Sequence, residues 1–380
     1  MSSRTTSTQH RAAIDGVRGL AALGVLGFHV WLYRDNRPHG ARHALHDHVL
    51  FSLNVGLILF FVLSGFLLYR AYARAIVRRD TLPTTGGYAR RRIARIVPAY
   101  YACGLGCFAL YAAVGPTGIQ PELHELPAFA VFAQNYSLDT LMQLNPVLWT
   151  LSVEAAFYVA LPLIALAATR LGTKGHVALL LGLVAFGIGF NVLDQTVFTG
   201  EIPGKTLPEW IGIFAIGMLA ALILEQRGNT SLTRSSTATC MLLGFAIVIL
   251  RAVWTESPVL PDPVLRGALL APLSAVGFAL VIAAAAEGGG RSISWLRSRP
   301  LAYAGLVSYG IYLWHVPVIL VLKERNALPV ALLPRLLTVL AITVAIASVS
   351  WRLIERPVIE RAHGRKRRKA RLAKPAMEAA

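Results

Sequence analysis

Two ionisable side chains, Arg18 and His29, lie inside a stretch that is otherwise apolar enough to cross a membrane. The stretch 14–33 reads IDGVRGLAALGVLGFHVWLY and has the length of a membrane-spanning helix. Arg18 and His29 are eleven residues apart, about three turns at ~3.6 residues per turn, so both side chains share one helix face. Ionisable groups at such depth are functional candidates, although a snorkelling arginine and a hydrogen-bonded core histidine are the plain alternative.

Two carboxylates are expected beside this pair. Asp15 lies three residues before Arg18, close enough on a helix to form an ion pair. Glu154 lies about one turn inside the apolar run that begins LWTLSVEAAFYVALPL, where a carboxylate is costly unless it meets Arg, His or a polar substrate. We expect Glu154 and His29 to meet at similar depth, as a carboxylate–imidazole pair that orients a general base.

A third group of candidates is basic. Arg91, Arg92 and Arg95 stand together in the segment YARRRIARIVPAYY, at the mouth of the third apolar run. Guanidinium groups suit the recognition of phosphate, whereas the plain alternative is the positive charge typical of a cytoplasmic loop. Ser64, in the run FFVLSGFLLYR, either permits close helix packing together with Gly65 or lines a cavity and donates a hydrogen bond.

The ninth apolar run, YAGLVSYGIYLWHVPV, carries a polar stripe. Ser308, Tyr312 and His315 stand at i, i+4 and i+7 and therefore share one helix face. We expect Pro317 to kink this helix. The last run ends in a predicted interfacial salt-bridge cluster of Arg352, Glu355 and Arg356.

The loop after the first apolar run is rich in histidine. Its members are His39, His43, His46 and His48. Imidazoles at i and i+3 or i+4 can share a metal ion, but no closed set of ligands is defined here. We therefore predict no metal site and expect a solvated loop whose charge responds to pH.

The composition places these residues in a membrane protein. Of the 380 residues, 55% are hydrophobic and 15% are charged, and the mean hydropathy is +0.57. Long apolar runs in such a chain indicate membrane spans. We predict an all-α, polytopic integral membrane protein with about ten transmembrane helices. The predicted spans are 14–33, 50–69, 96–114, 147–168, 175–193, 207–225, 238–254, 265–286, 303–322 and 331–354.

The basic residues fall in alternate loops, although a net charge of +18 alone would also suit nucleic-acid binding. The segment 70–95 carries eight arginines, whereas 115–146 carries no Lys or Arg. By the positive-inside rule both termini are cytoplasmic, with the basic loop around Arg34 and Arg37 as the exception. We therefore expect no nucleic-acid partner and a multi-pass protein of the cell (inner or plasma) membrane.

The chain is expected to divide into a cytoplasmic N-terminus at 1–13, a membrane domain at 14–357 and a basic cytoplasmic tail at 358–380. The tail would be attracted to anionic headgroups, which makes membrane lipids expected partners. The alternative is that the tail only determines topology. No convincing internal repeat is visible, which argues against a transporter built from two similar halves.

Six motifs in order give the chain a family resemblance. It resembles the acyltransferase-3 family, the polytopic bacterial membrane O-acyltransferases. The motifs are R-x10-H at Arg18 and His29, FFVLSGF at 60–66, RRxxRIxPxY at 91–100, LWxLSVE at 148–154, SYxIYLWHxP at 308–317 and ERP at 355–357. The chain departs from the family at Ala155 and Ala156, where a second acidic residue and Gln often follow the glutamate.

The resemblance implies an acyl-coenzyme A-dependent O-acyltransferase. The acyl group, expected to be acetyl, would go to a hydroxyl of a sugar, glycan or glycosylated acceptor in the cell envelope, and acyl-coenzyme A is a co-substrate rather than a bound cofactor. The resemblance makes His29 and Arg18 the essential pair. Its motifs imply a donor site of Arg91, Arg92, Arg95, Ser64 and Tyr100. Further candidate residues are Asp15, Trp149, Ser152, Ser308, Tyr312 and His315.

In the mechanism that we expect, His29 is the general base. It removes the proton from the acceptor hydroxyl while that oxygen attacks the thioester carbon. Glu154 orients the imidazole, and Arg18 stabilises negative charge on the donor or on the oxyanion.

Two alternatives remain open at this point. A covalent acyl-enzyme could form on Ser64, Ser152 or Ser308, although no Ser–His–Asp order is readable. The competing function is a membrane transporter or flippase for a glycan or small anion, with the intramembrane Arg, His and Glu as its relay. A transporter should move its substrate when no acyl donor is present.

Overall fold

The computed structural model describes residues 2–34, 45–116, 118–198, 200–228, 230–255 and 262–362. Within these ranges the regular secondary structure is helical and no strand occurs. The α-helices are α1 (Ser2–Leu32), α2 (Leu45–Ser52), α3 (Gly56–Arg78), α4 (Thr85–Val114), α5 (Leu126–Ala130), α6 (Trp149–Thr169), α7 (Thr173–Leu193), α8 (Leu207–Gln226), α9 (Arg234–Thr255), α10 (Pro263–Glu287), α11 (Arg299–Leu306), α12 (Ser308–Glu324) and α13 (Leu332–Ser350).

Nine helical segments in the described part of the chain are long and apolar enough to cross a membrane. The bent pair α11 and α12 makes up to ten if it counts as one span. Exposed apolar side chains such as Leu105, Val159 and Leu242 cover the outward faces of α4, α6 and α9, as expected against lipid. The predicted all-α, polytopic membrane fold is therefore confirmed.

Two features of the helices differ from the prediction. α1 begins at Ser2 rather than near residue 14, because the segment 2–13 contains no Gly or Pro that would end a helix. The ninth span is bent by 77° at the break beside Val307, whereas α12 continues through Pro317. The bend beside Val307 was not predicted, and the kink at Pro317 stays a prediction.

The surroundings of Pro317 show why α12 tolerates a proline. Proline has no N–H, so the carbonyl of Leu313, four residues earlier, loses its usual helical partner. That carbonyl instead accepts a hydrogen bond from Asn145 Nδ2 at 2.8 Å. A side chain from the segment before α6 thus satisfies the backbone group, and the helix needs no break there.

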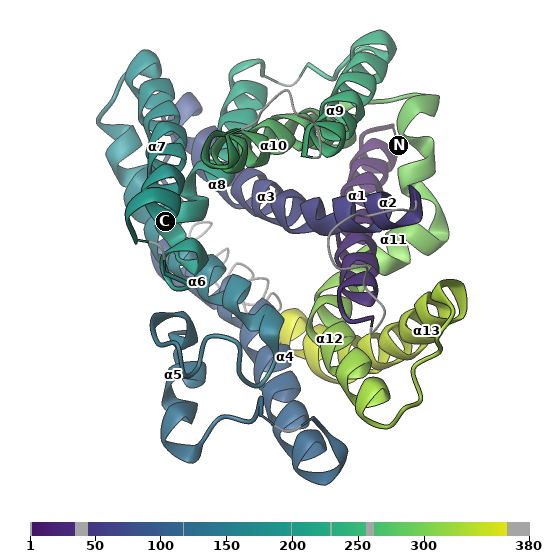
Figure 1. Ribbon diagram of the computed structural model, residues 1–380. Coiled ribbons are helices and arrows are strands. Elements are labelled where there is room, and N and C mark those ends of the chain that lie inside the picture. The colour runs from purple at the N-terminus through teal and green to yellow at the C-terminus, as the bar shows by residue number, and fades with distance from the viewer. Residues whose placement is uncertain are drawn as a thin grey trace, which may run out of the picture.

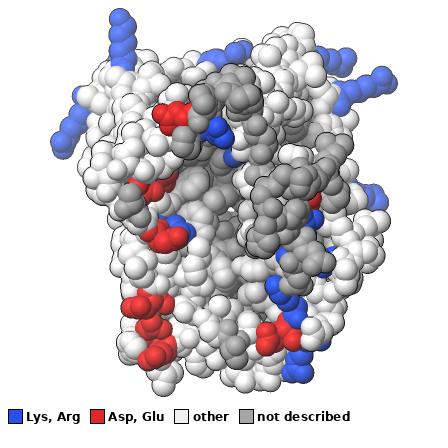
Figure 2. Space-filling model, viewed as in Figure 1, with Lys and Arg blue, Asp and Glu red and all other residues white. Residues whose placement is uncertain are grey.

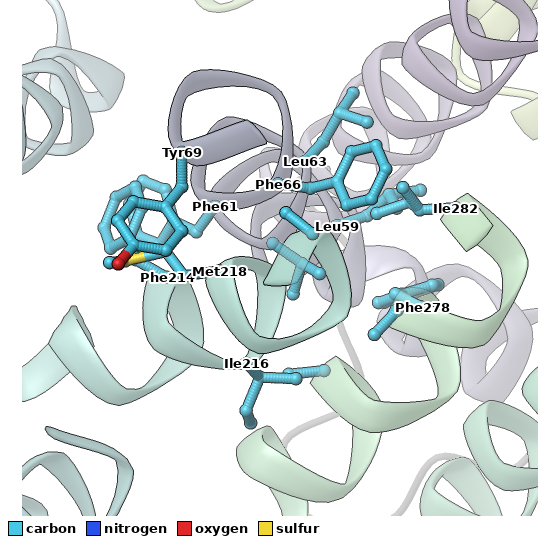
Figure 3. Close-up of a cluster of buried hydrophobic side chains, with 14 of the residues drawn as sticks. Leu59, Phe61, Leu63, Phe66, Tyr69, Phe214, Ile216, Met218, Phe278 and Ile282 are labelled. Carbon is cyan, nitrogen blue, oxygen red and sulfur yellow. The ribbon is translucent and has the colours of Figure 1, made fainter. Parts of the chain in front are cut away.

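α3 runs through the middle of the bundle, and α8, α10 and α1 all pack against it (Figure 1). Figure 3 shows the core between α3, α8 and α10, to which Phe66, Phe214 and Ile282 contribute. A Cβ added at Gly217 of α8 would lie 2.1 Å from the backbone oxygen of Val62 on α3. The two helix backbones therefore touch directly, which only glycine permits at this position.

Glycine also joins α1 to α11. A Cβ at Gly305 would lie 1.7 Å from the backbone oxygen of Asp15, and a Cβ at Gly19 would lie 2.4 Å from that of Leu301. This contact holds α11 against the first helix. The chain then turns by 77° beside Val307, so α12 leaves in a new direction into the bundle.

Polar contacts join helix ends on each side of the bundle. On one side, Arg70 of α3 bonds Glu225 of α8 at 2.7 Å and also Glu287 of α10. This side is termed the basic side, since it holds the arginine-rich segment 70–95. On the other, termed the far side, Asn135 Nδ2 donates to the backbone oxygen of Lys205 at 2.6 Å.

The described surface in the view of Figure 2 is largely uncharged. Acidic side chains gather along its left edge, and the lowest of them lie over the region where Figure 1 shows α5. Basic side chains stand mostly at the rim of the view. A broad uncharged surface is what a chain embedded in hydrocarbon requires.

The close contact of α3 and α8 leads to a first prediction. Gly217→Ala should lower the thermal unfolding midpoint of the purified protein in detergent, because overpacking at a fixed backbone contact costs about 1–3 kcal/mol. Gly182→Ala is the matched control, since a Cβ there meets nothing within 4 Å. The control should be neutral or stabilising, because alanine is the better helix former. Equal midpoints for both variants would contradict the proposed packing.

Candidate functional site

Five helices, α1, α3, α4, α6 and α12, surround a cavity of about 110 Å³ inside the bundle. Aromatic and aliphatic side chains such as Leu57 and Phe60 form part of its wall. The cavity wall also holds seven residues that the sequence singled out, namely Arg18, Ser64, Arg92, Arg95, Glu154, Ser308 and Tyr312. Motifs that are far apart in the chain therefore meet at one place.

A hydrogen bond joins two of these groups. Ser64 Oγ donates to Glu154 Oε1 at 2.7 Å, between α3 and α6. Both roles expected for the Ser64–Gly65 pair of α3, cavity lining and close helix packing, are present. Ser64 lines the cavity, and a Cβ at Gly65 would lie 2.1 Å from the backbone oxygen of Phe214. Glu154 is thus a hydrogen-bonded carboxylate on a cavity wall, as its cost within an apolar run requires.

The three arginines of the cavity are held in different ways. Arg18 lies 3.8 Å from Asp15, which confirms the expected pair. Arg95 lies 3.5 Å from the buried carboxylate of Glu355. The Arg92 guanidinium lies 6.0 Å from the ring centre of Tyr158, and its buried Nε has no hydrogen-bond partner among the described residues. Arg92 therefore has the donor capacity to bind an anion in the cavity.

The contact of Glu355 corrects the prediction for the end of the last span. Glu355 is buried and faces Arg95, with Ser350 Oγ donating to it at 3.5 Å. Arg356 instead pairs with Glu360 on the surface at 2.8 Å. The expected interfacial cluster is therefore wrong, because Glu355 turns inward to balance a cavity arginine.

The structure does not bring every predicted residue to the cavity wall. Arg91 is absent from it, because neighbours on a helix point about 100° apart while Arg92 and Arg95 share a face. Tyr100 Oη donates to the backbone oxygen of Phe129 at 2.9 Å, away from the cavity. Trp149 packs on Trp210, and Ser152 is buried with its Oγ unpartnered within the described part of the chain.

His29 and His315 form a pair one helical turn beyond the cavity. His29 Nδ1 lies 3.2 Å from His315 Nε2, and the ring centres are 4.8 Å apart. The expected contact between His29 and Glu154 does not occur; Glu154 pairs with Ser64 instead. The partner of His29 thus comes from the polar stripe of α12 and not from α6.

The hydrogen bonds of the pair assign its protons. His29 Nδ1 lies 2.9 Å from the carbonyl of Val25, and His315 Nδ1 lies 3.1 Å from that of Ile311. A carbonyl only accepts, so both Nδ1 atoms carry hydrogen and both Nε2 atoms carry lone pairs. The single hydrogen on His29 Nδ1 is then shared between the Val25 carbonyl and His315 Nε2 as a three-centre hydrogen bond. His29 Nε2 has no hydrogen-bond partner among the described residues and is left in the form that takes up a proton.

A small apolar cluster separates the cavity from the histidine pair. Val25, Val147, Tyr312 and Val316 are its buried members, with Phe60 packed against it. Tyr312 Oη is 2.5 Å from Thr150 Oγ1 and donates to the backbone oxygen of Val147 at 3.1 Å. We term these five residues the partition. Phe60 and Tyr312 line the cavity, whereas the Val25 carbonyl bonds to His29 Nδ1 and Val316 follows His315 in sequence.

Several contributors to the site were not singled out from the sequence. Thr150 bonds to the Tyr312 hydroxyl, and Asn145 bonds to the backbone of α12 at Leu313. The ring centre of Tyr309 lies 5.9 Å from the Arg95 guanidinium. Tyr309 lies in the SYxIYLWHxP motif, and Thr150 lies between named residues of LWxLSVE, so motif position was an available signal. Of the histidine-rich loop, His39, His43 and the side chain of His46 lie outside the described residues.

Comparisons with known proteins agree with this arrangement. The sequence model of an acyltransferase domain matches residues 11–353. The peptidoglycan O-acetyltransferase OatA of Listeria monocytogenes is 26% identical over 93% of this chain and 57% of its own length. YrhL of Bacillus subtilis, named as a candidate peptidoglycan O-acetyltransferase, is 24% identical over 92% of this chain and 56% of its own length.

A third relative is of similar size. Nodulation protein 10 of Rhizobium leguminosarum bv. viciae is 28% identical over 93% of this chain and 95% of its own length. The chain thus spans little more than half the length of the two relatives named for peptidoglycan. No solved structure matches it. Because the family match covers nearly the whole membrane-spanning part, the chain belongs to the acyltransferase-3 family.

Proposed function

We propose that this protein transfers a short acyl group, expected to be acetyl, from acyl-coenzyme A to a hydroxyl of an envelope glycan or other glycosylated acceptor. It would act in the inner or plasma membrane, with the donor on the basic, cytoplasmic side and the acceptor on the far side. The observation that carries this proposal is the arginine-lined cavity with a histidine pair one helical turn beyond it. The names of two relatives support O-acetyl transfer.

The chemistry of coenzyme A suits the cavity. It is an anionic, phosphate-rich chain with a thioester at its tip. Arg92 and Arg95 lie within the first three turns of α4, which begins next to the arginine-rich loop of the basic side, and Arg92 has a free donor. We propose that they bind the negative charge of the donor, and that Arg18 stabilises the oxyanion formed from the thioester carbonyl.

The histidine pair supplies the proton acceptor. As the acceptor oxygen attacks the thioester carbon, its proton passes to His29 Nε2, and His315 Nε2 holds the Nδ1–H of the same ring. A carbon–oxygen ester bond forms and the carbon–sulfur bond breaks. The thiolate of coenzyme A leaves and takes the proton back. In this conformation the partition lies between the cavity and the histidine pair. Tyr312 must therefore move aside for the transfer step, after the acyl group has been bound against the closed partition.

We favour direct transfer over an acyl-serine intermediate. Ser64 and Ser308 line the cavity, but in the described part of the chain no imidazole bonds to Ser64, Ser152 or Ser308. A serine without an adjacent base is a weak nucleophile, and Ser64 already donates its proton to Glu154.

Removal of the imidazole gives the sharpest test of the proposed base. His29→Ala should reduce transfer from acetyl-coenzyme A to an added glycan pool by about 10²–10⁴-fold, because a positioned base contributes that much. Donor binding and the thermal unfolding midpoint should change little. The control is His124→Ala, an exposed histidine near α5. Wild-type rates in His29→Ala would contradict the assignment.

The role of His315 can be separated from that of His29. His315→Gln keeps a group that can accept from His29 Nδ1, whereas His315→Ala does not. Transfer rates should therefore fall in the order wild type, Gln variant, Ala variant. An Ala variant that is as active as the Gln variant, with both folded, would show that His315 does not orient the base.

The arginines of α4 offer a matched pair for the donor site. Arg92→Ala should raise the donor KM more than it lowers kcat, since it removes binding of the donor charge. Arg91→Ala changes the same residue type one position earlier, outside the cavity wall. It should leave the donor KM nearly unchanged. Equal effects of the two variants would indicate general surface charge rather than a donor site.

A further inference from the structure

We propose that the partition sets the longest acyl chain that the enzyme accepts, with Phe60 as the residue that limits the acyl group to short chains. We term this role of the partition the gauge. This inference rests on the proposed function, because it concerns the same cavity and its donor. It goes further by assigning a structural cause for the choice of acyl group. The position of the closed end of the cavity determines which acyl group is used, and the arginines that bind the donor do not.

The lining residues stop at one level on three helices. The last lining positions toward the far side are Leu57 and Phe60 on α3, Thr150 on α6 and Tyr312 on α12. The next layer is packed solid, since Val25, Val147 and Val316 are at most 4% exposed. An acyl chain that enters the cavity therefore meets a closed apolar floor.

The floor is held by contacts of fixed geometry. The Tyr312 hydroxyl is 2.5 Å from Thr150 Oγ1 and 3.1 Å from the carbonyl of Val147, so its ring is anchored at the far end. The Phe60 ring meets the Tyr312 ring edge to face, with centres 5.8 Å apart. Phe60 is only half buried and lines the cavity itself. Truncation of Phe60 would thus deepen the cavity while the anchored tyrosine stays in place.

Length matters because the floor also sets the position of the reacting carbon. A two-carbon acyl group that touches the floor keeps its carbonyl next to the partition, one turn from His29. Each additional methylene moves that carbonyl back toward Arg18 and away from the base. In a closed apolar pocket one methylene changes discrimination by about 10–200-fold.

The test compares donors of increasing length in the purified full chain in nanodiscs. Acetyl-, propionyl-, butyryl- and hexanoyl-coenzyme A are supplied with a cell-envelope glycan pool, and thiol release and label on the glycan are both measured. The wild type should favour acetyl over butyryl by about 100-fold or more in kcat/KM. Phe60→Ala should reduce this ratio at least about tenfold, and Phe60→Leu should reduce it less.

Two further variants separate the gauge from general effects. Tyr312→Phe keeps the ring and should keep the preference for acetyl, even if the rate falls. Phe186→Leu is the matched control, because that side chain is 53% exposed on α7, away from the cavity. If Phe60→Ala does not fold, the milder Phe60→Leu carries the comparison.

The possible outcomes are distinct. If kcat/KM for butyryl-coenzyme A rises relative to acetyl-coenzyme A only in the Phe60 variants, the result supports the gauge. A wild type that uses hexanoyl as well as acetyl, or Phe60 variants with an unchanged ratio, overturns the gauge and leaves the acyltransferase proposal standing. A folded wild type that consumes no thioester of any length overturns the proposed function and the gauge with it.

Discussion

Charge inside a membrane-embedded bundle must be partnered, and the organisation of the site depends on this constraint. Arg18 is held by Asp15 and Arg95 by the buried Glu355, so two of the three cavity arginines are balanced by the protein. Glu154 is held by Ser64. Of these three arginines, only Arg92 has a buried donor atom without a partner among the described residues. The protein therefore offsets the cost of two of the three cavity arginines with its own carboxylates and leaves Arg92 with the most capacity for a ligand.

Close backbone contacts put these groups within reach of one another. Gly217 lets α8 touch α3, and Gly305 lets α11 touch α1, so the helices that carry Ser64 and Arg18 have fixed positions. The bend beside Val307 then directs α12 inward, where Tyr312 closes the cavity and His315 meets His29. Asn145 completes the arrangement by satisfying the carbonyl that Pro317 leaves free. Rigid packing around one anchored tyrosine is what keeps the inner cavity and the imidazole pair apart.

The sequence predicted the spans well because hydropathy is a local property of each segment. It also named Arg18, Ser64, Arg92, Arg95 and Glu154 as candidate site residues, and the structure brings these five to one cavity wall. It did not predict which side chains pair. His29 was expected to meet Glu154, but the rotation and depth of α6 and α12 depend on contacts between distant segments. The bend beside Val307 has the same origin, since α11 is held by Gly305 against α1. Helix geometry alone could have predicted that Arg91 points away from the face shared by Arg92 and Arg95.

The central claim is that donor and acceptor reach one site from opposite sides of the membrane. It is tested most directly in proteoliposomes whose protein orientation is known from protease access to the N-terminus. Labelled acetyl-coenzyme A is placed either inside or outside the vesicles, and the glycan acceptor is always outside. The account predicts label on the glycan only when the donor lies on the side of the N-terminus and the acceptor on the other. Equal transfer with both substrates on one side would contradict it.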